Sequence, residues 1–293
     1  MASKLLRRNL LFTIQKRAVK SSVTRNSIPW LRKSAPSSNW GYNGSELDPE
    51  DWPKEYQCGN CQSPIDIDLS KVTYSSELSP LEYSYPDNFK YMVNDGKNIR
   101  IHWRGETALS GGPLKGTYEL VQLHFHWGSA EGKGAEHLVN GESVEGEAHL
   151  VHWNPKYGSI REALKHQDGI AVVGVFLKEA DDGAESPLSS ILNRFPTLSK
   201  FNEKYIFEND VFNVGNLIPK NSDFICYDGG LTTPPLTECV QWIVLLKPLV
   251  VTKREMDIFR SLEGSFGNNF TDNFRPCQPV GDRVVSSSFE PEK

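Results

Sequence analysis

Two short segments of the chain could do metal chemistry. Residues 122–127 read Gln-Leu-His-Phe-His-Trp and residues 147–153 read Glu-Ala-His-Leu-Val-His-Trp. On a β-strand successive side chains point to opposite faces, so His124 and His126 share one face. His149 follows His126 by 23 residues, which is enough chain to return a neighbouring antiparallel strand. Three neutral imidazole nitrogens at about 2.0 to 2.1 Å make a zinc site with one open position, which is typical of catalytic rather than structural zinc.

His152 is the alternative third ligand, and the strand argument separates it from His149. The two residues lie three positions apart, so on one strand their side chains point to opposite faces. Glu147 precedes His149 by two positions and shares its face, where its carboxylate can accept the ring proton. Gln122 has the same relation to His124. Such partners fix the tautomer and orientation of metal-binding histidines, so the spacing favours His149.

The elements that must position these residues are mostly strands. Turns are expected at Asn94-Asp95-Gly96 and Asp228-Gly229-Gly230, and helices over Ser186–Phe195 and Lys253–Leu262, the second capped by Thr252. The sequence after the first 36 residues is long enough for one large core and shows no repeats, which favours a single domain over residues 37–293. The predicted strands are short runs rich in β-branched residues: Lys115–Trp127, Gly146–Trp153, Ile170–Leu177 and Val240–Leu246.

Several separate motifs follow one another in the sequence from roughly Trp40 to Phe289. They are Trp40-Gly41-Tyr42, Gln62–Ile67, Gly111–Leu114, the two histidine segments, Ser129-Ala130-Glu131, Glu136-His137, Leu231–Leu236, Arg275-Pro276 and Gln278-Pro279. Together and in this order, these motifs resemble the α-class carbonic anhydrases. The resemblance implies an α+β, mostly β fold: a large, twisted, mainly antiparallel sheet with short peripheral helices, zinc at the base of a conical cavity, and cis peptide bonds at Pro64 and Pro235.

The resemblance also implies a reaction and its machinery. The reaction is reversible hydration of carbon dioxide to bicarbonate and a proton, by attack of a zinc-bound hydroxide. The implied ligands are His124, His126 and His149, in agreement with the spacing. Thr232 would accept a hydrogen bond from the hydroxide and donate one to Glu136, which orients the nucleophile.

Further pocket residues follow from the same resemblance. The backbone carbonyl of Asn273 would orient the second ligand histidine. Carbon dioxide offers no strong hydrogen-bonding handle, so an apolar recess beside the metal suits it. The implied substrate pocket consists of Val151, Val172, Leu231, Trp242 and Thr233. Sulfonamide and anion inhibitors and a weak esterase side activity are expected as well, whereas the oligomeric state is not indicated.

The chain departs from the fastest members of that family at the proton shuttle. Those members carry a histidine after the Asn-Gly type turn, and here Lys97 stands there, with Arg100 as a second cation nearby. An unperturbed lysine, with a pKa near 10.4, is already protonated at neutral pH and cannot accept the proton. We therefore expect proton transfer to be slow, with Lys97 in the shuttle position.

The first 36 residues have a targeting composition. They contain nine lysines and arginines and no acidic residue, and the first acid of the chain is Glu46. Leu5 to Ile14 can form one apolar helical face, and no apolar run is long enough for a membrane helix. The preferred interpretation is a mitochondrial matrix presequence; a plastid transit peptide or a cytoplasmic protein with a basic tail are the alternatives. Removing the segment takes the formal charge from −5 to −14, which argues against nucleic-acid binding.

Cysteine usage fits a reducing compartment. Cys58 and Cys61 form a lone Cys-x-x-Cys pair, and Leu236 stands where secreted relatives have a cysteine. One such pair cannot supply four thiolates to a metal.

Two rival functions remain open at this stage. One is an acatalytic carbonic anhydrase-like binding module, since the family contains relatives that lost zinc ligands. The other is a different zinc hydrolase. Measuring zinc content together with carbon dioxide hydration distinguishes the module from the enzyme.

Overall fold

The computed structural model describes residues 40–42, 48–54, 56, 59–86, 89–180, 186–207, 212–265, 267 and 269–291. They all belong to the second of two units of the chain, Ala35–Lys293. The predicted presequence, its boundary with the domain, and Cys58 lie outside the described residues. Within them, Cys61, Cys226, Cys239 and Cys277 are free cysteines.

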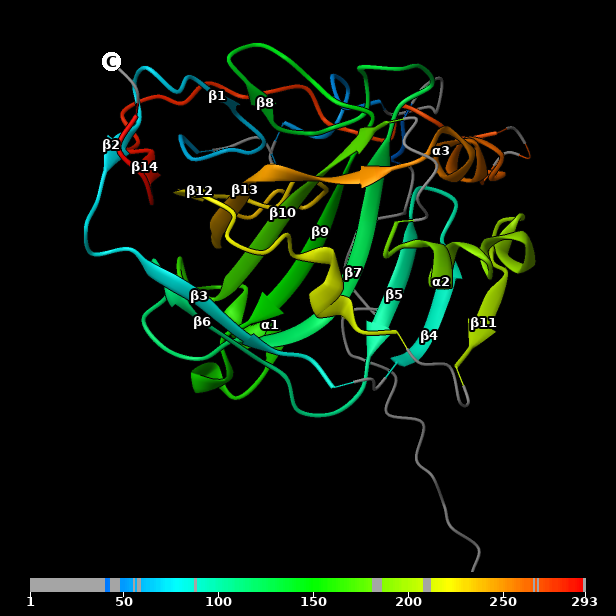
Figure 1. Cartoon of the computed structure of the whole chain (residues 1–293), viewed down its shortest axis with the longest axis horizontal. Helices are drawn as coiled ribbons and strands as arrows, with labels where there is room; N and C mark the ends of the chain where they lie inside the picture. The colour runs from blue at the N-terminus through cyan, green and yellow to red at the C-terminus, as the bar shows by residue number, and fades with distance from the viewer. Residues whose placement is uncertain are drawn as a thin grey trace, which may run out of the picture. The chain divides into compact units, whose positions relative to one another are not determined.

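A ten-stranded sheet organises the described part of the chain, in the order β11-β4-β5-β7-β9-β10-β13-β12-β14-β2 (Figure 1). The β10–β13 and β14–β2 pairings are parallel and the others antiparallel, which confirms the mainly antiparallel fold. The strands are β2 (Thr73–Tyr74), β4 (Phe89–Asn94), β5 (Ile99–Trp103), β7 (Glu119–Trp127), β9 (Gly146–Trp153), β10 (Ile170–Glu179), β11 (Lys204–Ile206), β12 (Phe224–Gly229), β13 (Val240–Val251) and β14 (Ser286–Ser287).

Two small sheets and a few short helices lie around this sheet. The predicted cis bonds precede Pro64 and Pro235. The small sheets pair β1 (Asp66–Ile67) with β8 (Leu138–Val139), and β3 (Ser79–Ser84) with β6 (Ala108–Gly112). The α-helices are α1 (Ile160–Ala163), α2 (Ser189–Leu192) and α3 (Lys253–Arg260), and the 3₁₀ helices are Pro155–Tyr157, Phe195–Leu198 and Val214–Leu217. No helix in the described ranges has the length and apolar character needed to cross a membrane.

The helix and turn predictions were partly right. Thr252 caps α3 in a full capping box with Glu255, as the sequence predicted. The helix predicted over Ser186–Phe195 is wrong in extent: it is limited to α2, and the chain then forms a 3₁₀ helix whose second residue is Pro196, because proline lacks the amide hydrogen an α-helix needs.

The turn predicted at Asp95 is present between β4 and β5, where the Asp95 amide donates to the Asn98 carbonyl at 3.0 Å. The turn predicted at Asp228-Gly229-Gly230 is wrong, because Asp228 and Gly229 continue β12 and pair with Gln241 and Val240.

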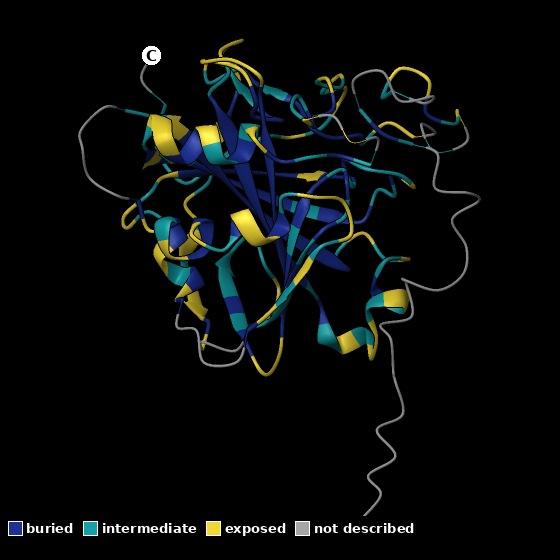
Figure 2. Ribbon diagram, turned by 90° about the vertical axis from the view of Figure 1, so that its right-hand side faces the viewer, coloured by how far each residue is buried: buried dark blue, intermediate teal, exposed yellow. Residues whose placement is uncertain are grey.

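The central strands are buried on both faces (Figure 2). On β7, Leu123, Phe125 and Trp127 belong to the larger hydrophobic core, together with Leu150 of β9 and Val173 of β10. Side chains alternate along a strand, so His124 and His126 of β7 and His149 of β9 project from the opposite face. The prediction that apolar and imidazole side chains separate onto two faces of this strand is confirmed.

Candidate metal centre

His124 and His126 of β7 meet His149 of β9 on one face of the sheet. His124 and His149 are directly opposite one another in the register of the two strands. His149 Nδ1 lies 3.1 Å from His126 Nε2 and 3.2 Å from His124 Nε2. Ligands at about 2.0 to 2.1 Å in tetrahedral geometry would lie about 3.3 to 3.4 Å apart. The three rings are therefore spaced as ligands of one small cation.

The second nitrogen of each ring faces an acceptor. His126 Nδ1 donates to the Asn273 carbonyl at 2.7 Å, and His149 Nε2 to Glu147 Oε1 at 2.9 Å. His124 Nδ1 lies 3.0 Å from Gln122 Oε1. Burial lowers the pKa of all three imidazoles below the ordinary value, so each is neutral and carries its one proton on that outer nitrogen. Three unshared electron pairs then point at one another, an arrangement that fits a bound Zn²⁺.

Glu147 is held from four directions. Its Oε1 accepts from His149 and, at 2.8 Å, from His137 Nδ1, while Oε2 accepts from the amides of Glu136 and His137 at 3.0 and 2.9 Å. Burial alone would raise the pKa of this carboxyl, but its interactions with His137 and His149, hydrogen bonds included, outweigh burial and lower the pKa well below its usual range. Although His137, Glu147 and His149 are close enough to suggest a second metal cluster, both ring protons already occupy Oε1.

Gly174 of β10 makes room for that carboxylate. It lies opposite His149 in the β9–β10 register. A Cβ atom at this position would lie 2.7 Å from Glu147 Oε1, closer than a real contact allows. Only glycine fits beside Glu147 in its present position.

His152 lies away from this group, as the face argument predicted. Its Nε2 is 2.9 Å from the Tyr85 hydroxyl, and its Nδ1 is 3.3 Å from the carbonyl of Ala171. Both side chains are buried. The structure therefore brings His149, and not His152, together with His124 and His126.

Asn273 is fixed by its own side chain. Its Nδ2 donates to the carbonyls of Lys97 and Phe125 at 3.1 Å each, and its Oδ1 accepts from the amide of Trp127 at 2.8 Å. These bonds tie a segment without regular secondary structure to β7. They hold the Asn273 carbonyl where His126 needs an acceptor.

Glu136 adds a buried carboxyl to the same space. Its Oε2 lies 3.4 Å from His126 Nε2 and has no hydrogen-bond partner of good geometry among the described residues. Its Oε1 accepts from the amide of Arg275 at 2.9 Å. Burial raises the pKa of Glu136 well above its usual range, and the nearby Thr232 hydroxyl partly offsets that effect. Thr232 thus lies near Glu136, and the hydrogen bond between them stays a prediction.

The predicted apolar residues form one wall beside the histidines. Val151 faces Val172 across β9–β10, and Val172 faces Trp242 across β10–β13. The Trp242 ring lies 4.9 Å from that of His149, centroid to centroid. Leu231 packs against the same hydrophobic cluster while remaining partly exposed, and Thr233 is partly exposed in the adjacent segment.

Lys97 occupies the turn between β4 and β5. Its ammonium lies 4.1 Å from the centre of the Trp40 ring. Burial lowers the pKa of Lys97 from its ordinary value; the charge of Asp95 opposes this shift and that of Arg100 adds to it. The pKa thus moves in the direction a proton shuttle needs, while contact with the aromatic face favours the charged form.

Two residues near the site had no assigned role in the sequence analysis. His137 shares Glu147 with His149, and its Nε2 lies 2.7 Å from the Tyr227 hydroxyl. The Arg275 guanidinium is buried and donates to Gln62 Oε1 and to the Ser63 carbonyl. Neither residue lies on a long strand, so alternation along the sequence carries no signal for them.

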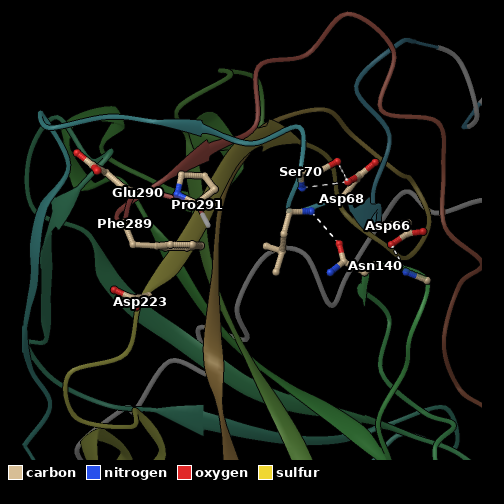
Figure 3. A pocket seen from close by; sticks show the side chains of 10 residues that line it. Asp66, Asp68, Ser70, Asn140, Asp223, Phe289, Glu290 and Pro291 are labelled. Atoms are coloured by element: carbon tan, nitrogen blue, oxygen red, sulfur yellow. Dashed lines mark hydrogen bonds between the residues drawn. The ribbon is translucent and has the colours of Figure 1, made fainter. Parts of the chain in front are cut away.

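A separate pocket of about 980 Å³ lies between the segment after β1 and the C-terminal residues (Figure 3). Asp66 and Asp68 line one side, and Asp223, Phe289 and Glu290 the other. Two of its acidic residues already have partners within the protein: Asp68 pairs with Lys71, and Asp66 accepts from the Gly141 amide. The pocket shares no residue with the histidine cluster.

Comparison with known proteins places these residues in context. Residues 47–289 match the family model for eukaryotic-type carbonic anhydrase. Carbonic anhydrase 7 of Mus musculus is 42% identical over 262 residues, which cover 86% of this chain and 97% of the relative. Carbonic anhydrase 7 of Homo sapiens is also 42% identical over 262 residues, with 85% and 97% covered. Carbonic anhydrase 3 of Rattus norvegicus is 39% identical over 268 residues, with 87% and 100% covered.

Proposed function

The chain belongs to the eukaryotic-type carbonic anhydrase family, whose catalytic members are zinc enzymes that hydrate carbon dioxide, and we propose that His124, His126 and His149 hold the zinc ion. The observation that carries this proposal is the set of three buried, neutral rings with their unshared pairs facing one another. Zinc bound there lowers the pKa of water to about 7, a value established on carbonic anhydrase itself, and so supplies a nucleophile at neutral pH.

The residues behind the ligands set their orientation. Gln122, Asn273 and Glu147 each accept the outer ring proton of one histidine. This fixes the tautomer, so the inner nitrogen is always the one with the unshared pair. Glu147 is anionic, and its charge makes His149 the most basic donor of the three. His137 helps to hold that carboxylate in place.

Thr232 and Glu136 orient the attacking oxygen. When the Thr232 hydroxyl donates to Glu136, its own oxygen is left only as an acceptor. It then takes a hydrogen bond from the nucleophile, whose unshared pair is turned towards the substrate. The Arg275 amide keeps the Glu136 carboxyl in position by donating to its other oxygen.

The wall of Val151, Val172, Leu231 and Trp242 would receive carbon dioxide. Three of these side chains are buried and the fourth is partly exposed. An uncharged linear molecule gains from displacing water there, whereas the bicarbonate product does not. Thr233, partly exposed, adds the polar edge of the pocket.

Proton removal is the step we expect to limit turnover. With a pKa near 7 and reprotonation at roughly 10¹⁰ per molar per second, unaided loss of the proton to water is on the order of 10³ per second. Lys97 stands where a shuttle is expected, and its ammonium rests on Trp40. Burial lowers the pKa of Lys97, but the contact with Trp40 favours the protonated form, and we expect Lys97 to be a poor acceptor at pH 7.

Secondary properties follow from the family and the sequence. Inhibition by sulfonamides and anions and a weak esterase activity are expected of such a site. The basic residues 1–36, which precede the matched range 47–289, are proposed as a mitochondrial presequence that directs the domain to the matrix.

Stopped-flow hydration of carbon dioxide by the purified protein, with and without added zinc, tests the proposal. We expect zinc-dependent hydration with one zinc ion per chain. Thr232→Val is the matched variant, since it keeps the shape of the side chain and all three ligands while removing the hydroxyl. It should retain zinc and lose most of the activity. A zinc-loaded wild-type protein without hydration activity would instead support the acatalytic binding module.

A further inference from the structure

Arg100 lies on the metal-facing side of the sheet. It is directly opposite His124 in the β5–β7 register. Residues paired in this way present their side chains on the same face, with Cβ atoms about 4.5 to 5.5 Å apart. The Arg100 side chain is 17% exposed. A mostly buried guanidinium therefore lies next to the first of the three histidines.

The guanidinium is anchored through only one of its nitrogens. Arg100 Nε donates to Asp95 Oδ2 at 2.5 Å. The other oxygen of Asp95 accepts from the amides of Lys97 and Asn98 at 3.0 and 2.7 Å, so the turn fixes the carboxylate. Within the described residues no acceptor contacts Nη1 or Nη2, and neither nitrogen is sealed from solvent. Both terminal groups remain available as donors to a ligand.

The charges around this position favour an anion. Lys97 is a second cation on the same turn, and Asp95 neutralises one of the two. Glu147 is committed to His137 and His149, and a metal at the histidine cluster adds positive charge. Burial is the main cause of the lowered pKa of His124 and His126, and the charge of Arg100 contributes in both cases. The field of the guanidinium thus reaches the metal position.

We propose that Arg100 is a specificity-determining residue that binds a small oxyanion, in the first place bicarbonate, through Nη1 and Nη2 while the anion occupies the metal centre. This inference rests on the proposed function. A planar guanidinium offers two parallel donors that match two oxygens of bicarbonate or nitrate. Carbon dioxide is uncharged and gains little from the same group. Arg100 therefore strengthens the binding of the product relative to that of the substrate and makes the enzyme sensitive to inorganic oxyanions.

The test compares three zinc-loaded variants with the wild-type holoenzyme. Arg100→Gln removes the charge and keeps a similar length, and Arg100→Lys keeps the charge but loses the paired donors. Arg161→Gln, which removes an exposed cation on α1, is the control. Zinc content and circular dichroism establish that each protein is loaded and folded. The measured quantities are the inhibition constants of bicarbonate and nitrate in the hydration assay, and the dissociation constant of nitrate by calorimetry.

Both inhibition constants should rise about tenfold in Arg100→Gln, the effect of losing one charge-assisted hydrogen bond. Arg100→Lys should fall in between, and the control should match the wild type. Constants within twofold of the wild type in Arg100→Gln would overturn the inference. If Arg100→Gln loses zinc, Arg100→Lys is the deciding variant. Its inhibition constants should rise about threefold, and unchanged constants would refute the inference. Absence of hydration in the wild type would contradict the proposed function, and nitrate calorimetry would still test Arg100.

Discussion

Replacing His149 or His152 with alanine should give opposite results, although the two residues lie three positions apart on β9. His149→Ala removes one of three converging nitrogens and leaves Glu147 Oε1 with His137 as its remaining ring partner. The protein should then fail to retain zinc and should lose hydration activity. Changes to outer partners of a metal ligand cost about 10 to 100-fold in metal affinity, so loss of the ligand itself should exceed 100-fold.

His152→Ala should destabilise the fold and leave zinc binding unchanged. The buried Tyr85 hydroxyl loses its partner at 2.9 Å, and an unsatisfied buried hydroxyl costs about 1 to 3 kcal/mol. For a domain of this size, a loss of about 2 kcal/mol lowers Tm by roughly 4 to 8 °C. Zinc content should remain at one ion per chain, because no ligand or ligand partner has changed.

Zinc content after dialysis, chelator competition for affinity and calorimetry for Tm separate the two variants. Glu147→Gln provides an intermediate: its carbonyl oxygen can still accept from His149 and His137, but its NH2 group cannot accept from the backbone amides of Glu136 and His137, and the negative charge is lost. Its zinc affinity should fall by about 10 to 100-fold. Zinc lost from His152→Ala but kept by His149→Ala would refute the assignment of the third ligand and the strand reasoning behind it.

Three further outcomes are expected. Lys97→His should raise turnover in weak buffer with little change in kcat/KM, and imidazole-type buffers should have the same effect on the wild type. Stopped-flow turnover near 10⁶ per second for the wild type in weak buffer would refute slow proton transfer. His102→Phe should flatten the dependence of stability on pH. Burial, aided by Arg100, Lys90 and Lys204 and opposed by Asp95, lowers the pKa of His102 from 6.5 to about 4, so the unfolded chain binds the proton first. The stability contribution of neutral His102 is complete above pH 6.5 and is lost as the pH falls towards 4. Urea unfolding at pH 7 and at pH 4.5 gives the free energy of unfolding at each pH, and the decrease between them should be smaller in the variant by roughly 2 to 3 kcal/mol. A decrease equal to that of the wild type would contradict the prediction. Residues 1–36 fused to a fluorescent reporter should direct it to mitochondria, and a secreted or diffuse reporter would exclude the presequence.

The parts of the molecule that sequence reasoning predicted best are those where one strand decides the geometry. Alternation alone separates His124 and His126 from Leu123 and Phe125, because the period of two holds whatever the strand packs against. The Glu147–His149 contact follows from the same period. No family knowledge is needed for either.

Residues on irregular segments are different, since their position depends on contacts distant in sequence. Glu136, Thr232 and Asn273 were predicted only through the family resemblance. The Arg275 amide that holds Glu136 was missed because nothing near it in sequence indicates burial. Asp228-Gly229-Gly230 has turn composition, but pairing of β12 with β13 overrides that local preference.

The position of the three histidines on neighbouring strands has a thermodynamic consequence. His124 and His149 are already opposite one another in hydrogen-bonded strands, so a metal joining them closes no new loop of chain. In zinc fingers, by contrast, metal binding and folding are a single event. Here folding of the sheet already fixes the positions of the ligands before any metal binds, so the metal-free domain should remain folded. Zinc then stabilises the protein only by mass action, in proportion to the logarithm of its free concentration over the dissociation constant. The metal-free chain should therefore fold first and bind zinc afterwards.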